Sequence, residues 1–139
     1  MYKSPQKPQI LEFEWPGTPN SQVFDFNINI LQQTTNFASI SQNTTIVLPP
    51  GHYYCIAYPD FTRSAASHNN AVYWHLNNTQ IGNIGGSDHY QSNNTDNPEA
   101  SFTLTQTGNL NLRQTQWFGS GTSLAFTNDS RGLIMRVVI

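Results

Sequence analysis

The residues with the greatest potential for chemistry in this chain are its four histidines and eight carboxylates. The histidines are His52, His68, His75 and His89. None of them are separated by the short intervals that let one strand or helix present two imidazoles to a zinc ion. Asp88 precedes His89 and could orient its imidazole, but no nucleophile motif accompanies the pair. We therefore expect no metal site, no cofactor and no catalytic site, and we predict that the protein is not an enzyme.

Two glutamates form a close carboxylate pair. Glu12 and Glu14 are two residues apart, so on a strand they would share one face. Glycoside hydrolysis requires such a pair to flank a cleft at a separation of roughly 5–9 Å. Nothing in the sequence indicates a cleft here. We predict instead a polar strand face whose glutamates pair with Arg113 or Arg136.

Aromatic residues provide candidate contacts with a partner. Trp117 and Phe118 precede Gly119-Ser120-Gly121, so we predict that they lie on a loop or bulge. Rings on a loop can stack on a sugar or anchor a protein partner, because they supply a large rigid contact area. The alternative is that one ring caps the end of the fold. A second set of candidate contacts lies in the polar segment 87–98 and consists of Asp88, His89 and Tyr90.

The composition excludes several classes of protein. Charged residues make up 10% of the 139 residues, the net charge is -2, and Asn, Gln, Ser and Thr together are about as frequent as the hydrophobic residues at 37%. Six scattered basic residues give no patch for phosphates, so we expect no nucleic-acid binding. No apolar run reaches the length of a membrane span, and the N-terminus lacks the apolar core of a signal peptide. The single cysteine, Cys55, cannot form a disulfide within the chain.

The elements that must position these residues are strands, because apolar residues recur with period two and no helical spacing is sustained. The last of them, 133–139, is apolar on both faces except at Arg136, which is typical of a strand at a sandwich centre or a subunit contact. We predict an all-β antiparallel sandwich or barrel of eight to ten strands in one domain, 10–139, after an extended arm, 1–9. The predicted strands cover 11–15, 24–30, 45–48, 53–58, 71–76, 81–84, 101–105, 110–114, 124–126 and 133–139.

A family resemblance refines this fold. An apolar strand, a Leu-Pro-x-Gly-x-Tyr turn and a second strand occur in Thr45-Ile46-Val47-Leu48-Pro49-Pro50-Gly51-His52-Tyr53-Tyr54. This pattern resembles C1q/TNF-like jelly rolls, in the compact form found on bacteriophage fibres and capsids. The strand and Asn-rich turn at 73–79, the Phe-Thr-Leu strand at 102–104 and the Leu-x-Leu strand at 110–113 extend the resemblance over roughly 44–113. Related fibre domains carry more Arg and Glu along these strands, so the resemblance does not predict a ligand for this chain.

The resemblance implies a homotrimer and a virion role. We expect a structural subunit on the virion surface, such as a capsid decoration or cement protein, that binds other virion proteins such as a major capsid or vertex protein. It would be made in the host cytoplasm without a signal peptide. The chain is almost immediately in strand and encodes no shaft, which favours this role over a fibre tip. The alternative is a fibre- or spike-tip module that binds a host receptor or glycan.

The parity of the last strand predicts the trimer interface. If Leu133 and Met135 face the core, then Ile134, Arg136 and Val138 face outward and need cover. We expect the strand 71–76 to lie in the same sheet as the last strand. Two of its side chains, Tyr73 and His75, would then point outward on the same face as Ile134, Arg136 and Val138. The predicted interface is therefore Tyr73, His75, Ile134, Arg136 and Val138. The alternative is that the N-terminal segment covers this face.

Overall fold

The chain forms strands joined by turns and loops. The computed structural model describes residues 7–15, 23–59, 61–63, 68–85, 97–118, 124–126 and 130–137. No helix long and apolar enough to cross a membrane occurs in them. The strands are β1 (Gln9–Glu14), β2 (Val23–Asp25), β3 (Asn29–Gln33), β4 (Ser39–Ser41), β5 (Thr45–Leu48), β6 (Gly51–Tyr58), β7 (Phe61–Arg63), β8 (His68–Leu76), β9 (Thr79–Gly85), β10 (Glu99–Leu104), β11 (Gly108–Phe118), β12 (Leu124–Phe126) and β13 (Arg131–Val137).

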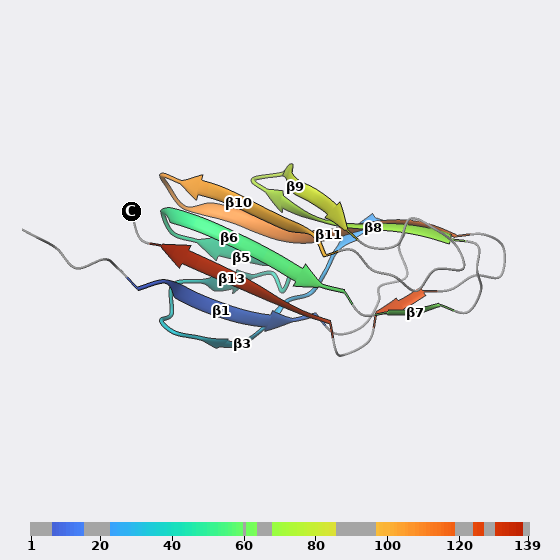
Figure 1. Cartoon of the computed structure of the whole chain (residues 1–139), viewed down its shortest axis with the longest axis horizontal. Helices are drawn as coiled ribbons and strands as arrows, with labels where there is room; N and C mark the ends of the chain where they lie inside the picture. The colour runs from blue at the N-terminus through green and yellow to red at the C-terminus, as the bar shows by residue number, and fades with distance from the viewer. Residues whose placement is uncertain are drawn as a thin grey trace, which may run out of the picture.

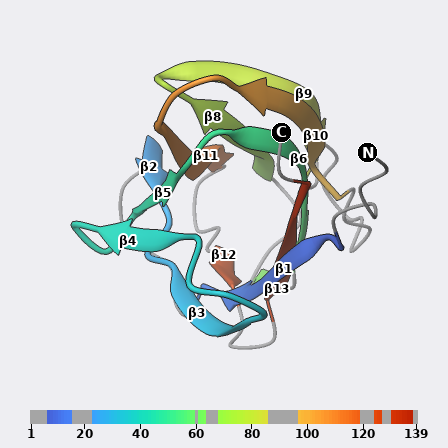
Figure 2. The ribbon, with the colours of Figure 1, turned by 90° about the vertical axis from the view of Figure 1, so that its left-hand side faces the viewer.

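Two antiparallel sheets form the sandwich (Figures 1 and 2). The five-stranded sheet has the order β10-β6-β13-β1-β3, and the six-stranded sheet has the order β4-β5-β11-β8-β9 with β2 also paired to β11. A third, two-stranded sheet pairs β12 with β7. The predicted all-β antiparallel sandwich is confirmed. The structure has more strands than the eight to ten expected. The predicted strand 24–30 is divided into β2 and β3, and β4 and β7, with three residues each, are too short for period-two alternation to be recognised.

The core lies between the two sheets. Phe13 of β1 meets Trp74 of β8 edge-on with ring centroids 5.7 Å apart, and the Trp74 indole N–H donates to the Pro98 carbonyl at 3.1 Å. The core side of β13 is shaped by Gly132, because a Cβ there would overlap the Phe13 ring. The fully buried apolar side chains include Leu11, Phe13, Trp15, Ile46, Leu48, Cys55, Ala57, Val72, Trp74, Leu110, Leu112 and Ile134.

Hydrogen bonds join the two sheets along both edges of the sandwich. At one edge the Asn83 side chain of β9 donates to the Asn97 carbonyl at 3.2 Å and accepts from the Glu99 N–H at 3.0 Å. Gly82 (φ +70°) allows this close approach, because a side chain there would overlap the Glu99 carbonyl. At the other edge, the Ile28 N–H before β3 donates to the Asn43 carbonyl before β5 at 2.8 Å.

Tight turns with left-handed residues connect two hairpins. Asn77 and Asn78, between β8 and β9, have φ of 50° and 68°, as in a type I′ turn. This confirms the tight turn that the Asn-Asn pair predicts. Gln42 and Asn43, with φ of 53° and 65°, form a similar turn between β4 and β5 that the sequence analysis did not identify.

The prediction of which side chains of the last strand face the core is wrong. Ile134 is fully buried in the core, and Arg136, on the same side of β13, closes one end of it. The Arg136 guanidinium donates to the Pro50 carbonyl, with Nε at 3.1 Å, and through Nη1 to Gln9 Oε1 at 2.7 Å. The physical reason is the packing of Gly132 against Phe13, which fixes Gly132 and every second residue after it on the core side.

The predicted combination of strands in the interface is also wrong. Tyr73 and His75 lie on β8 in the six-stranded sheet, whereas β13 is the central strand of the five-stranded sheet. The two therefore cannot share an outer face with Ile134 and Arg136. Val138 lies outside the described residues.

Candidate functional site

The outer face of the five-stranded sheet is apolar at its centre. Cross-strand register places Met135 between Ile10 of β1 and Tyr54 of β6, and the next row places Leu133 beside Ile56. Three of the four large hydrophobic side chains that are exposed among the described residues lie on this face, at 41–46% exposure: Leu31, Tyr58 and Val137. We call this surface the apolar face: Ile10, Leu31, Tyr54, Ile56, Tyr58, Leu133, Met135 and Val137.

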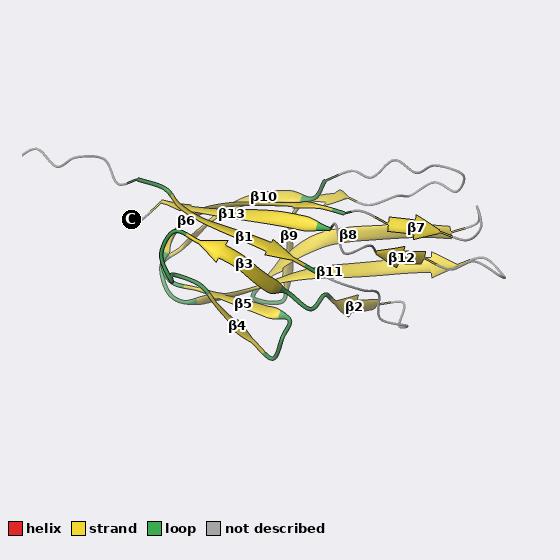
Figure 3. Ribbon diagram, turned by 90° about the horizontal axis from the view of Figure 1, so that it is seen from below, coloured by secondary structure: helices red, strands yellow, loops and turns green. Residues whose placement is uncertain are grey.

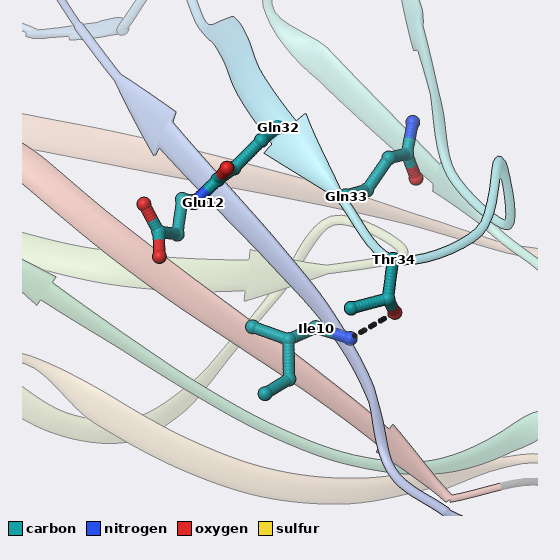
Figure 4. A pocket seen from close by; sticks show the side chains of 5 residues that line it. All are labelled: Ile10, Glu12, Gln32, Gln33 and Thr34. Atoms are coloured by element: carbon teal, nitrogen blue, oxygen red, sulfur yellow. Dashed lines mark hydrogen bonds between the residues drawn. The ribbon is translucent and has the colours of Figure 1, made fainter.

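Two hollows flank Glu12 on this face. One, of about 380 Å³, is lined by Ile10, Glu12, Gln32, Gln33 and Thr34 (Figure 4). In Figure 4 the Gln32 side chain points toward Glu12 and the Gln33 side chain points away. The Thr34 hydroxyl accepts from the Ile10 N–H at 2.9 Å. The other hollow, of about 350 Å³, is lined by Glu12, Phe13, Leu31, Tyr58, Arg131, Gly132 and Leu133.

Polar and charged groups surround the apolar centre. Glu14 forms an ion pair with Arg131 at 3.1 Å, and the His52 Nδ1 lies 2.9 Å from the Thr103 hydroxyl. Glu14 pairs with Arg131 because β1 and β13 place the two directly opposite each other. The prediction that the glutamates pair with Arg113 or Arg136 is therefore wrong for Glu14. Both of those arginines have other partners.

Tyr54 and Glu99 provide a measurable electrostatic coupling on this face. The Tyr54 hydroxyl donates to Glu99 Oε2 at 2.6 Å. This hydrogen bond, followed by burial and the charge of Glu99, raises the pKa of Tyr54 to about 12. A Glu99→Gln variant is expected to move the Tyr54 pKa down toward the ordinary value of about 10, because the phenolate no longer faces a carboxylate.

An alkaline difference titration, followed by the ultraviolet absorbance of tyrosinate, measures this shift, with circular dichroism as the check on folding. Ser101→Ala is the matched control, since Ser101 is the exposed register partner of Tyr54 on the same strand as Glu99. If Glu99→Gln leaves the titration unchanged, Glu99 is not the cause of the raised pKa.

The outer face of the six-stranded sheet has a different character. Asp25 accepts two hydrogen bonds from Arg113, with Nε at 2.7 Å and Nη2 at 3.3 Å. The Tyr73 and Thr115 hydroxyls are 2.7 Å apart. His75 lies beside the Tyr73 ring, with centroids 5.2 Å apart, and burial and the nearby Arg113 lower its pKa. This polar network is where the structure places two of the predicted interface residues.

Asn111 extends the polar network toward β5. Its side-chain amide donates to the Thr45 hydroxyl at 3.0 Å and to the Thr44 carbonyl at 3.2 Å. Most of the described groups of this face therefore hydrogen-bond to one another, and its described side chains are uncharged apart from the Asp25–Arg113 pair. Asn111 and Thr115 thus occupy outward strand positions on this sheet, whereas apolar side chains occupy the centre of the opposite face.

The predicted contact residues are placed only in part. The backbone of Trp117 and Phe118 belongs to β11, where the two pair with Asn69 and His68 of β8, so the predicted loop begins later than expected. Nothing is described of their side chains. Asp88, His89 and Tyr90 lie outside the described residues. Within the described ranges, no three His, Cys, Asp or Glu side chains gather where a metal ion could bind.

The apolar face was not predicted, although the sequence contains a signal for it. The doubly apolar strand 133–139 predicted either a sandwich centre or a subunit contact, and β13 is the central strand of its sheet with apolar side chains on both sides. Ile56 on the neighbouring strand β6 was not recognised, because one outward Ile between Cys55 and Ala57 does not stand out from an apolar strand.

Comparisons with known proteins identify the fold. No family model and no curated protein matches the sequence. Among solved structures, the chain is similar to murine APRIL in crystal structures at pH 5.0 (TM-score 0.65, 10% identity), pH 8.5 (TM-score 0.62, 10% identity) and pH 8.0 (TM-score 0.55, 9% identity). Each match covers 94% of this chain and 100% of the other. At such identity the likeness shows the fold alone, and it confirms the expected C1q/TNF-like jelly roll.

Proposed function

We propose that this TNF-like jelly roll is a non-enzymatic structural subunit of a bacteriophage particle, which decorates or cements the capsid as a homotrimer. The observation that carries the proposal is the apolar face. A central strand with Leu133 and Met135 on its outer side is unfavourable on a surface that stays in water. Contact with further copies of the chain would bury these side chains, and burial of apolar surface is the main driving force for association.

The composition of the apolar face resembles that of known subunit interfaces. Interface cores are apolar with aromatic residues and Met enriched, and their rims are polar. Here Met135 and Tyr54 lie at the centre, while Glu14 with Arg131 and His52 with Thr103 form the rim. The hollows beside Glu12 and the exposed Leu31, Tyr58 and Val137 supply both recesses and projecting side chains for a second copy.

The low charge of the chain supports a role in a particle. The opposite face is a network of amides and hydroxyls around one ion pair. Hydrogen-bonded contacts of this kind depend less on salt than charge pairs do. We assign this face to contacts with neighbouring virion proteins, on the surface of a particle assembled from protein made in the host cytoplasm.

Two measurements test the proposal. Quantitative mass spectrometry of purified particles should find this chain at a fixed, stoichiometric copy number, and its absence would refute the virion role. Light scattering coupled to size exclusion should give the mass of a trimer, and a stable monomer at high concentration would contradict the interface. Glycan-array binding without incorporation into particles would favour the alternative, a receptor- or glycan-binding tip module.

A further inference from the structure

Three polar atoms in the core have no hydrogen-bond partner among the described residues. They are the indole Nε1 of Trp15 and both amide atoms, Nε2 and Oε1, of Gln114. Both side chains have 0% exposure. Buried amides and indoles are almost always hydrogen-bonded, because an unsatisfied group loses its contacts with water and gains nothing in return. These three atoms therefore require a partner inside the core.

The two side chains lie in the same layer of the core. Phe13 and Trp74, in contact at 5.7 Å, mark a layer that spans both sheets, and Leu112 is the register partner of Trp74. Trp15 lies two residues beyond Phe13, and Gln114 lies two residues beyond Leu112. β1 and β11 run in the same direction along the long axis (Figures 1 and 3), so both steps lead into the next layer.

Phe26 connects Trp15 to the neighbouring part of β11. Its ring lies 5.6 Å from the Trp15 ring, centroid to centroid. Its backbone N–H donates to the Leu112 carbonyl at 2.8 Å, immediately before the part of β11 that contains Gln114. Trp15 and Gln114 thus approach a common region from opposite sheets, and no bond joins them directly.

We propose that this layer is a binding site for ordered water, in which one molecule accepts a hydrogen bond from the Trp15 indole and donates one to Gln114 Oε1. Water fits the chemistry because the site needs an acceptor for one group and a donor for another. A second molecule accepts from Gln114 Nε2. No charged ligand is indicated, since the described side chains that face this layer from β1, β8 and β11 are Trp15, Val72 and Gln114, and the buried Ser130 beside Trp15 is also uncharged.

Nuclear magnetic resonance of the ¹⁵N-labelled protein tests this site. The Trp15 indole proton is expected to show a rotating-frame Overhauser cross-peak to water, whose sign separates it from simple proton exchange. Trp74 is the internal control, because its indole is equally buried but donates directly to the Pro98 carbonyl. Its proton is expected to show no such peak. A Trp15 indole without a water contact would overturn the proposal.

A Gln114→Met variant sharpens the test. Methionine keeps most of the glutamine volume but removes both amide atoms, so the Trp15–water peak is expected to disappear while the Trp74 indole is unaffected. Persistence of the peak in this variant would show that Gln114 does not hold the water. If the variant does not fold, a high-resolution crystal structure of the unmodified protein decides. Electron density for a water molecule within hydrogen-bonding distance of both Trp15 Nε1 and Gln114 Oε1 supports the site. A direct hydrogen bond from the Gln114 side chain to another protein group refutes it.

Discussion

If the proposed trimer forms through the apolar face, a Met135→Glu variant is expected to be a folded monomer at concentrations at which the unmodified protein associates. Met135 lies at the middle of the apolar face, between Ile10 and Tyr54 in register, and its half-buried position can hold a solvated carboxylate in the free subunit. Association would strip that carboxylate of water without supplying a cation. The cost is about 3 kcal/mol or more, which weakens association at least about a hundredfold.

Size exclusion with light scattering measures this loss, and circular dichroism checks the fold. The matched control is Val47→Glu, which makes a similar change at a half-buried outward position of β5, on the opposite face of the sandwich. The control is expected to remain trimeric. Trimers of undiminished stability in Met135→Glu would show that the apolar face is not the subunit interface.

Replacing Gly132 with alanine is expected to lower the free energy of unfolding by about 1–3 kcal/mol, although alanine normally suits a strand better than glycine does. The added methyl group would overlap the Phe13 ring, which is fully buried and in contact with the rings of Trp15 and Trp74. The ring has little room to move, so the strand must shift instead. Chemical denaturation of the monomeric Met135→Glu background measures the effect without a contribution from association.

Gly108→Ala is the control for this substitution. Its added methyl group would meet the Leu104 side-chain carbons at 2.8 and 2.9 Å, and these are the mobile end of a flexible side chain. The expected loss is therefore smaller. A Phe13→Leu substitution should make Gly132→Ala less damaging than it is alone, because the two residues share one space. Strict additivity would contradict the packing explanation.

The sequence predicted the strands well but not the faces of the last one. Alternation positioned most strands, since Leu11 and Phe13, or Leu110 and Leu112, differ clearly from their neighbours. Residues 133–137 are apolar at four of five positions, so there is no period-two signal. The sequence therefore could not predict which face of this strand is turned toward the core. What fixes it is the contact of Gly132 with Phe13, which is about 120 residues away in sequence.

The assignment of strands to sheets was equally beyond local patterns. The strand 71–76 was expected in the same sheet as the last strand, but β8 pairs with β11 and β9 in the other sheet. Such pairing depends on contacts between distant segments. The buried Gln114, in contrast, could have been found, because it continues the inward series of Leu110 and Leu112 on one strand.

The hydrogen bond between Gln9 and Arg136 has a practical consequence for protein engineering. It joins the start of β1 to the end of β13, whose Cα positions are register partners and so lie about 5 Å apart. The start of β1 and the end of β13 lie together at the end of the sandwich that is opposite β7 (Figure 1). A short linker between residues 7 and 137 would bridge this gap, so the chain is suited to circular permutation with new ends at the Asn77-Asn78 turn.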